Sequence, residues 1–220
     1  MEDIWERFEA PVVVDAGSGN AYLGFILYEL FFKGSDKGEL YSLESREDLT
    51  HRAQERAARL GFERMRFFHG KLEEPAACPE RVHLMVALHA CDTATDDALA
   101  LAIQRQADHV AVVPCCQAEV AQQLKENRDK PAQALQPLFQ HAWHRREFGS
   151  HLTNVIRAQT LESFGYQVTV TELTGWEHSL KNELILGRRV HRENRPAKLR
   201  LQQLLKDAGV TPKLVRTLGI

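Results

Sequence analysis

Long apolar runs are missing from this sequence, and no stretch of its 220 residues approaches the length that spans a bilayer. The first residues, "MEDIWERFEAPVVV", are acidic and lack the continuous apolar segment of a signal peptide. We therefore expect neither membrane insertion nor a signal peptide.

Cysteine is also scarce, and the four residues are Cys78, Cys91, Cys115 and Cys116. They form no C-x-x-C pair and no spacing typical of a disulfide framework. The adjacent Cys115 and Cys116 can bond to each other only with strain. These absences favour a cytoplasmic protein with free thiols in a reducing compartment.

A strong charge bias is absent as well, because the formal net charge is only −2. The chain as a whole therefore has no preference for nucleic acid. The stretch 192–220 differs, since it has seven Lys or Arg against two acidic residues, a local excess of +5. This tail is either a solvated terminal helix or a docking surface for a polyanion.

What the sequence does contain is a regular alternation of apolar strands and helical patterns. With 44% hydrophobic residues, the chain can form one well-packed domain. The alternation predicts an α/β fold with a doubly wound, mostly parallel sheet. No helical pattern separates the last two strands, so one of them should run antiparallel. Seven strands are expected, at 11–17, 38–45, 64–70, 82–90, 109–116, 166–173 and 182–190.

Helical patterns lie between these strands. The first, 21–32, directly follows a glycine turn, and a long one is expected over 148–164. Ser45, followed by Asp48 three residues later, resembles a capping box that starts the helix after the second strand.

The turn "DAGSG" after the first strand indicates a nucleotide site. Gly17 and Gly19 allow a tight turn and a close approach of ligand to backbone. A dinucleotide site would need glycine or alanine where Tyr22 stands. The carboxylate of Asp15 would repel a pyrophosphate and suit the positive amino and sulfonium groups of S-adenosylmethionine. Glu44, at the end of the second strand, is placed to accept hydrogen bonds from both ribose hydroxyls.

Four motifs resemble those of class I S-adenosylmethionine-dependent methyltransferases, and of one methyltransferase-domain family in particular. They are "DAGSGNAYLG" at 15–24, "LHACDTATDDA" at 88–98, "VVPCC" at 112–116 and "HSLKNELILG" at 178–187. The resemblance implies a seven-stranded sheet and S-adenosylmethionine as cofactor, while acceptors are poorly defined for many members and some are linked to RNA. Ala21 stands where a third glycine is common, and we expect an alanine to cost little there.

On this basis we assign residues 1–192 to a methyltransferase domain and 193–220 to a basic helical extension of it. The donor site is predicted to use Asp15, Gly17, Gly19 and Glu44. The residues that border its adenine are expected to be Gly70, Lys71 and Leu72, at the end of the third strand.

The acceptor side is expected where the fourth and fifth strands end, with His89, Cys91, Asp92 and Cys115 as catalytic residues. Three hypotheses stay open. His89 and Asp92 orient the acceptor or take its proton; a thiolate adds covalently to a pyrimidine; or His89, Cys91, Cys115 and Cys116 bind a soft metal, although their spacing matches no known ligand frame. We favour the first, with no metal. A strand-end cysteine can equally be a small apolar filler.

Two further segments could reach an acceptor. Residues 141–151, "HAWHRREFGSH", combine arginines with aromatics, which suits either RNA or a solvated helix face. Residues 178–182 and Trp176 could lie over the active site. The sequence therefore predicts a methyltransferase whose acceptor is unidentified, with RNA favoured and small molecules or proteins as alternatives. Rivals are a protein that binds RNA or a partner without turnover and a dinucleotide oxidoreductase; the oligomeric state is left open.

Overall fold

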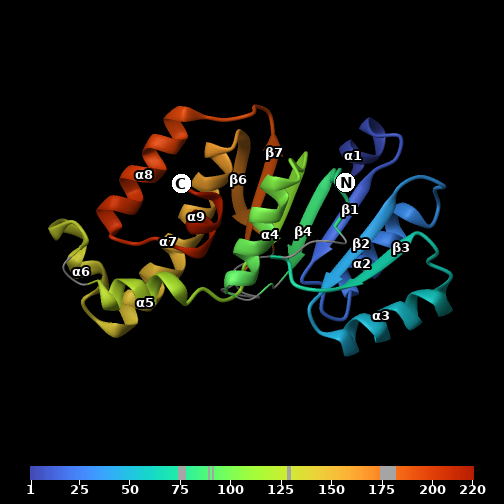
Figure 1. Ribbon diagram of the computed structural model, residues 1–220, viewed down its shortest axis with the longest axis horizontal. Coiled ribbons are helices and arrows are strands. Elements are labelled where there is room, and N and C mark those ends of the chain that lie inside the picture. The colour runs from blue at the N-terminus through green and yellow to red at the C-terminus, as the bar shows by residue number, and fades with distance from the viewer. Residues whose placement is uncertain (74–77, 89, 91, 128–129, 174–181) are drawn as a thin grey trace.

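The computed structural model describes residues 1–73, 78–88, 90, 92–127, 130–173 and 182–220. Its centre is a seven-stranded sheet in the order β3-β2-β1-β4-β5-β7-β6 (Figure 1). β7 is antiparallel to both of its neighbours, and the other pairs are parallel. The predicted doubly wound sheet with one antiparallel strand is confirmed. The strands are β1 Val12–Ala16, β2 Glu39–Glu44, β3 Met65–His69, β4 Leu84–Leu88, β5 His109–Val113, β6 Tyr166–Glu172 and β7 Glu183–Arg189.

Helices lie on both faces of this sheet. Their bounds are α1 Glu2–Arg7, α2 Tyr22–Leu27, the π-helical turn η1 Tyr28–Phe32, α3 Glu47–Leu60, α4 Thr93–Gln104, α5 Glu119–Glu126, the 3₁₀ turn η2 Gln133–Leu135, α6 Gln136–Phe139, α7 Ala142–Ser163, α8 Arg195–Ala208 and α9 Lys213–Leu218. No helix in the described ranges is long and apolar enough to cross a membrane.

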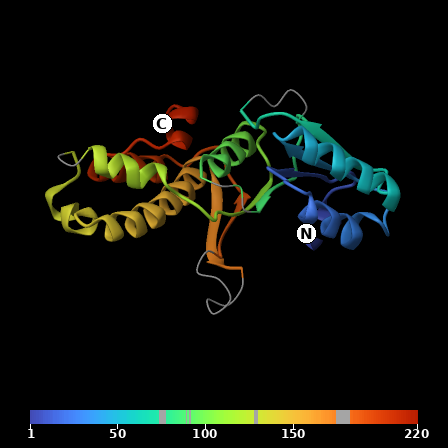
Figure 2. The same cartoon turned by 90° about the horizontal axis from the view of Figure 1, so that it is seen from below.

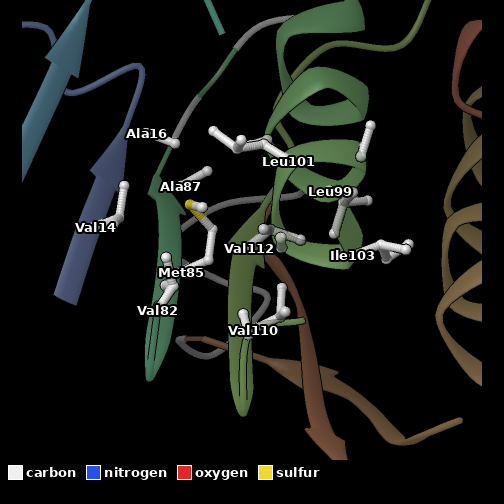
Figure 3. Close-up of a cluster of buried hydrophobic side chains, with 14 of the residues drawn as sticks. Val14, Ala16, Val82, Met85, Ala87, Leu99, Leu101, Ile103, Val110 and Val112 are labelled. Carbon is white, nitrogen blue, oxygen red and sulfur yellow. The ribbon is translucent and has the colours of Figure 1, made fainter. Parts of the chain in front are cut away.

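The apolar strands bury alternate residues on the two faces, as the period of two dictates. Met85, Ala87, Val110 and Val112 pack under α4 in one cluster, which Figure 3 shows from β1 across to β5. A second cluster lies on the opposite face, beneath α1, α2 and α3. β1 contributes Val14 to the first cluster and Val13 to the second, so it is covered on both faces.

A helical lobe extends beyond the β6 edge of the sheet (Figure 2). It contains α5, α6, α7 as far as Ile156, α8 and α9 around a third apolar cluster that includes Leu124, Ile156 and Leu201. The helices α8 and α9 belong to the expected extension 193–220, and they share this core with α5 and α7.

Two local predictions were wrong. The helix α3 begins after Arg46, and the Ser45 hydroxyl faces the Glu44 carboxylate at 3.4 Å and caps no helix. The helix α7 begins at Ala142, six residues before the expected start. In both cases the helix forms where the sequence predicted one, and only its first residue differs.

Candidate functional site

The glycine turn lies at the carboxyl end of β1 and is attached to the end of β2. Gly17 and Gly19 have φ of +69° and +57°, which glycine adopts without strain. The N–H groups of Gly17 and Ser18 both donate to the Leu43 carbonyl, at 2.9 and 3.0 Å. The turn is thereby held against the strand end where the predicted ribose ligand Glu44 follows.

Ala21 also has a positive φ, +57°, although it carries a Cβ and is fully buried. An alanine in the left-handed region costs about 1 kcal/mol relative to its preferred conformations. The expectation that alanine costs little here was therefore wrong. Strained residues of this kind cluster at ligand sites, where the surrounding structure holds them in place.

The Glu44 side chain accepts hydrogen bonds from this turn and from Arg46. Its Oε2 accepts from the Gly19 N–H at 2.7 Å, and its Oε1 accepts from the backbone N–H and the Nε of Arg46 at 3.0 and 3.1 Å. Burial by itself would raise the pKa of the carboxyl, but these hydrogen bonds outweigh it and hold the pKa below its ordinary value. The group is ionised at neutral pH.

A carboxylate accepts at about four lone-pair positions. Among the described residues, Oε1 of Glu44 already serves two N–H donors and Oε2 only one. One ribose hydroxyl therefore fits on Oε2 directly. A second needs the Arg46 guanidinium, whose side chain is 64% exposed, to move away. The site fits a ribose, with one hydrogen bond immediately available.

Asp15 lies deeper than the sequence suggested, because its side chain points under α2 toward Gly24. The residue is only 2% exposed, and its Oδ2 has no hydrogen-bond partner among the described residues. Burial raises the pKa of this carboxyl to about 7, although the Gly24 backbone N–H opposes the shift. Asp15 is thus only partly ionised at neutral pH, which weakens the electrostatic argument against a pyrophosphate. Its direct contact with a donor stays a prediction.

The three consecutive residues predicted to border the adenine have different surroundings. The Gly70 N–H donates to the Glu44 carbonyl at 3.0 Å, so Gly70 adjoins the predicted ribose site. Lys71 and Leu72 instead line a cavity of about 440 Å³ together with Asp97 and Lys213. Of the three, Gly70 is thus the one placed by a hydrogen bond beside a predicted donor residue.

On the acceptor side, His89 and Cys91 lie outside the described residues. Asp92 ends the fourth-strand motif and holds it to the segment after β5. Its N–H donates to the Cys116 carbonyl, and its Oδ1 accepts from the Ala118 N–H, both at 3.0 Å. Asp92 therefore contacts the segment that follows β5, where Cys115 is half-buried and Cys116 exposed.

The backbone of Asp92 is strained, with φ +49° and ψ −118°. Such a conformation costs on the order of 1–3 kcal/mol and persists only where neighbours enforce it. Hydrogen bonds at both the carbonyl and the N–H of Asp92 hold it in this conformation. Its carbonyl accepts from Nη2 of Arg157 at 2.8 Å, while its N–H is held by Cys116. A non-glycine outlier at this strand end supports its place in the candidate site.

Arg157 was not predicted from the sequence; it is 1% exposed and holds the Asp92 carbonyl within a buried hydrogen-bond network. Its Nε donates to Oδ1 of Asp96 at 2.7 Å, and its Nη1 donates to Oδ1 of Asn154 at 3.2 Å. Asn154 in turn donates to Oε2 of Glu183 at 2.9 Å, and it accepts from the Gln117 amide at 3.3 Å. The network joins the start of α4, the segment after β5, α7 and the start of β7.

A signal for Arg157 was present in the sequence. It is the only Asp, Glu, Lys or Arg between Glu147 and Glu162, within a stretch of helical apolar spacing. Its partner Asp96 lies within the motif "LHACDTATDDA", but no role was predicted for it. Asp96 is 3% exposed, and burial raises the pKa of its carboxyl even beside the guanidinium.

The basic tail is less available than its sequence suggests. Lys213 contacts the carboxylates of Glu73 and Asp97 at 2.5 and 2.7 Å. Arg216 pairs with Glu119 at 2.8 Å and Arg200 pairs with Glu162 at 3.2 Å, while Arg195 pairs with Glu193 of the tail itself at 3.3 Å. Much of the local excess of +5 is therefore neutralised by acids from elsewhere in the chain.

The segment 141–151 presents a different surface. Trp143 is 64% exposed, and the Arg146 guanidinium lies 4.3 Å from its ring centroid. Trp176 and residues 178–181 lie outside the described residues, while Asn182 is buried.

Comparison with known proteins matches residues 1–123, more than half of the chain, to a family model described as "Methyltransferase domain". Among curated proteins, a human "Glutathione S-transferase C-terminal domain-containing protein" is 27% identical over 194 residues. The match covers 80% of this chain but 29% of that protein, as it does for the macaque counterpart. The chain thus spans less than a third of the length of these relatives.

Among solved structures, an rRNA methylase from Streptococcus thermophilus has a TM-score of 0.55 and 14% identity. The match covers 86% of this chain and 93% of that one. A precorrin-6y C5,15-methyltransferase from Geobacter metallireducens has a TM-score of 0.51 and 12% identity, and the match covers 84% of each chain. These two names point to unrelated acceptors, so the likeness shows the fold alone.

Proposed function

The chain belongs to the methyltransferase-domain family, and from this premise we propose that it transfers the methyl group of S-adenosylmethionine to RNA. The main support for binding of the methyl donor is the hydrogen bond between the positive-φ glycine turn and the ionised Glu44. The family and the class I fold support an enzyme that uses S-adenosylmethionine.

At the donor end, Glu44 would accept a ribose hydroxyl on Oε2, and the turn from Gly17 to Ala21 would follow the ligand closely. S-adenosylmethionine, when bound, supplies an electrophilic methyl group on a sulfonium. The protein's own task is to place the acceptor in line with that group. Asp92 and the network around Arg157 lie at the neighbouring strand ends, where this positioning would occur.

The proposal that RNA is the acceptor rests on the face of α7 that runs toward this site. Trp143 and Asn154 are eleven residues apart, which is about three helical turns, so they lie on the same face about 16 Å apart. An exposed tryptophan with an arginine over its ring is suited to stack an unpaired base. Asn154, at the other end of this face, belongs to the Arg157 network.

Calorimetric titration with S-adenosylmethionine, S-adenosylhomocysteine and NAD tests the donor site. We expect Glu44→Gln to weaken binding of the first two about 10- to 100-fold, because it removes a charged hydrogen-bond acceptor. Glu39→Gln is the matched control, since Glu39 starts the same strand and pairs with Arg66 at 2.9 Å. Equal affinity in both variants would refute the assignment of Glu44. Binding of NAD alone would favour the dinucleotide oxidoreductase.

Transfer of a labelled methyl group into RNA, protein and small-molecule fractions tests the acceptor. We expect label that ribonuclease releases, reduced about tenfold by Trp143→Ala through loss of one stacking contact. Leu138→Ala, at an exposed apolar residue of the nearby α6, should leave labelling unchanged. Label in the other fractions would reject RNA but keep the enzyme. Donor binding without any transfer would favour a binding protein.

A further inference from the structure

The start of β7 brings a carboxylate to the acceptor side of the candidate site. β7 is antiparallel to β5, and Ile185 pairs with Val112. Two residues further along each strand, Glu183 therefore lies level with Pro114, just beyond the carboxyl end of β5. Side chains two residues apart on a strand share a face, so Glu183 lies on the same face as the buried Ile185.

A buried hydrogen-bond network holds this carboxylate in place. Oε2 of Glu183 accepts from the Asn154 amide at 2.9 Å. The orientation of that amide is fixed, because Oδ1 of Asn154 accepts from Nη1 of Arg157 at 3.2 Å and from the Gln117 amide at 3.3 Å. Arg157 in turn donates to the carbonyl of the strained Asp92 at 2.8 Å. Three consecutive hydrogen bonds therefore join Glu183 to the end of the fourth-strand motif.

Glu183 keeps hydrogen-bonding capacity for another molecule. In the part of the chain that the structure describes, its half-buried side chain accepts one hydrogen bond, whereas a carboxylate can accept about four. The other acids near this network are less available. Asp96 is 3% exposed and paired with Arg157, and Oδ1 of Asp92 already accepts a backbone N–H. Glu183 is therefore the best placed of these acids to meet an acceptor.

The position of Glu183 is unfavourable for the sheet itself. Glu172 of β6 pairs directly with Glu183, so two acidic side chains lie opposite each other on one face. Like charges in such a cross-strand pair destabilise a sheet. A residue that breaks a local rule in this way is typical of a functional site.

We propose that Glu183 is a catalytic residue, which takes the proton that an amino group of an RNA base loses when it is methylated. This inference rests on the proposed function and names the reacting group of its acceptor. In the step, the lone pair of the amino nitrogen forms a bond to the methyl carbon, and the bond from that carbon to sulfur breaks with its electrons left on sulfur. One N–H proton passes to the Glu183 carboxylate.

The chemistry of a carboxylate favours an amino group. An ionised carboxylate only accepts hydrogen bonds, so it pairs with a donor on the acceptor molecule, such as the amino group of cytosine. A ring nitrogen without a proton offers no such donor. A hydroxyl needs a stronger base before it attacks, whereas an amino nitrogen becomes acidic as the bond to the methyl carbon forms.

The rate of methyl transfer from labelled S-adenosylmethionine into total cellular RNA tests this role. At saturating donor, we expect Glu183→Gln to lower the rate about 100-fold, because a positioned base contributes about 10²–10⁴-fold. Its affinity for S-adenosylhomocysteine should equal that of wild type. Glu172→Gln is the matched control, because it removes the same like-charge pair from the other strand and should leave the rate unchanged. Neither variant should be less stable than wild type in urea unfolding, since glutamine keeps an oxygen for Asn154.

Two further measurements separate a catalytic role from a structural one. Formate should raise the rate of Glu183→Ala, because a small carboxylate can replace the missing proton acceptor. Digestion of the labelled RNA to nucleosides should show the methyl group on an amino nitrogen, by comparison with chromatographic standards.

The inference would be overturned by a wild-type rate in Glu183→Gln, by a Glu183→Ala rate that formate does not raise, or by label on a ribose hydroxyl or a ring nitrogen. Each of these results would leave the proposed function standing. A wild-type chain that labels no RNA would instead reject the proposed function, and this inference with it.

Discussion

The buried pair of Arg157 and Asp96 allows a quantitative prediction. Arg157→Leu removes the guanidinium but leaves the Asp96 carboxyl 3% exposed, with no charge to balance it. A buried carboxyl without a counter-charge binds a proton, because burial disfavours its ionised form. Its ordinary pKa is 3.8, so keeping it protonated at pH 7 costs about 4 kcal/mol. This value lies within the range observed when one partner of a buried pair is removed.

The same reasoning fixes the direction of the pH dependence. The Asp96 carboxyl is protonated in the folded variant and ionised in the unfolded chain, so folding takes up a proton. The free energy of unfolding of the variant therefore falls by about 1.4 kcal/mol for each unit of pH above 3.8. At pH 5.5 the loss due to Asp96 should be only about 2 kcal/mol.

Urea unfolding at pH 7.0 and 5.5, followed by circular dichroism, measures both quantities. Asp96→Asn in the Arg157→Leu background should abolish the added pH dependence, because no titrating carboxyl remains. Arg216→Leu is the control: its side chain is 51% exposed and paired with Glu119, so it should cost at most about 1 kcal/mol. A loss below about 1 kcal/mol for Arg157→Leu, or an equal loss at both pH values, would refute the reasoning.

Two other substitutions test the packing and the burial of the site. Gly149→Ala should destabilise the protein by about 1–3 kcal/mol in urea unfolding despite its better helix propensity, because the new Cβ would lie 2.7 Å from the Ala121 backbone; unchanged stability would show that α5 and α7 can separate. Relative to wild type, Asp15→Asn should gain about 1.4 kcal/mol of stability per pH unit between pH 5 and 7. The reason is that the wild-type carboxyl, with its pKa raised to about 7, disfavours folding increasingly up to that pH. Parallel plots of the free energy of unfolding against pH for the two proteins would contradict the burial of Asp15.

Local patterns were sufficient for much of this protein. Apolar period and turn residues predicted seven strands and the antiparallel partner at the end of the chain, because those signals depend on near neighbours. Gly17, Gly19 and Glu44 were likewise recognisable. They close consecutive elements of one strand–turn–helix–strand unit, and parallel topology then brings them to one edge of the sheet.

Burial and charge pairing were decided only by the tertiary structure. Asp96 and Arg157 are 61 residues apart, and Lys213 finds Glu73 across 140 residues. No local pattern encodes such partners, so the buried ion pair was not predicted and a largely neutralised tail was interpreted as an excess of charge.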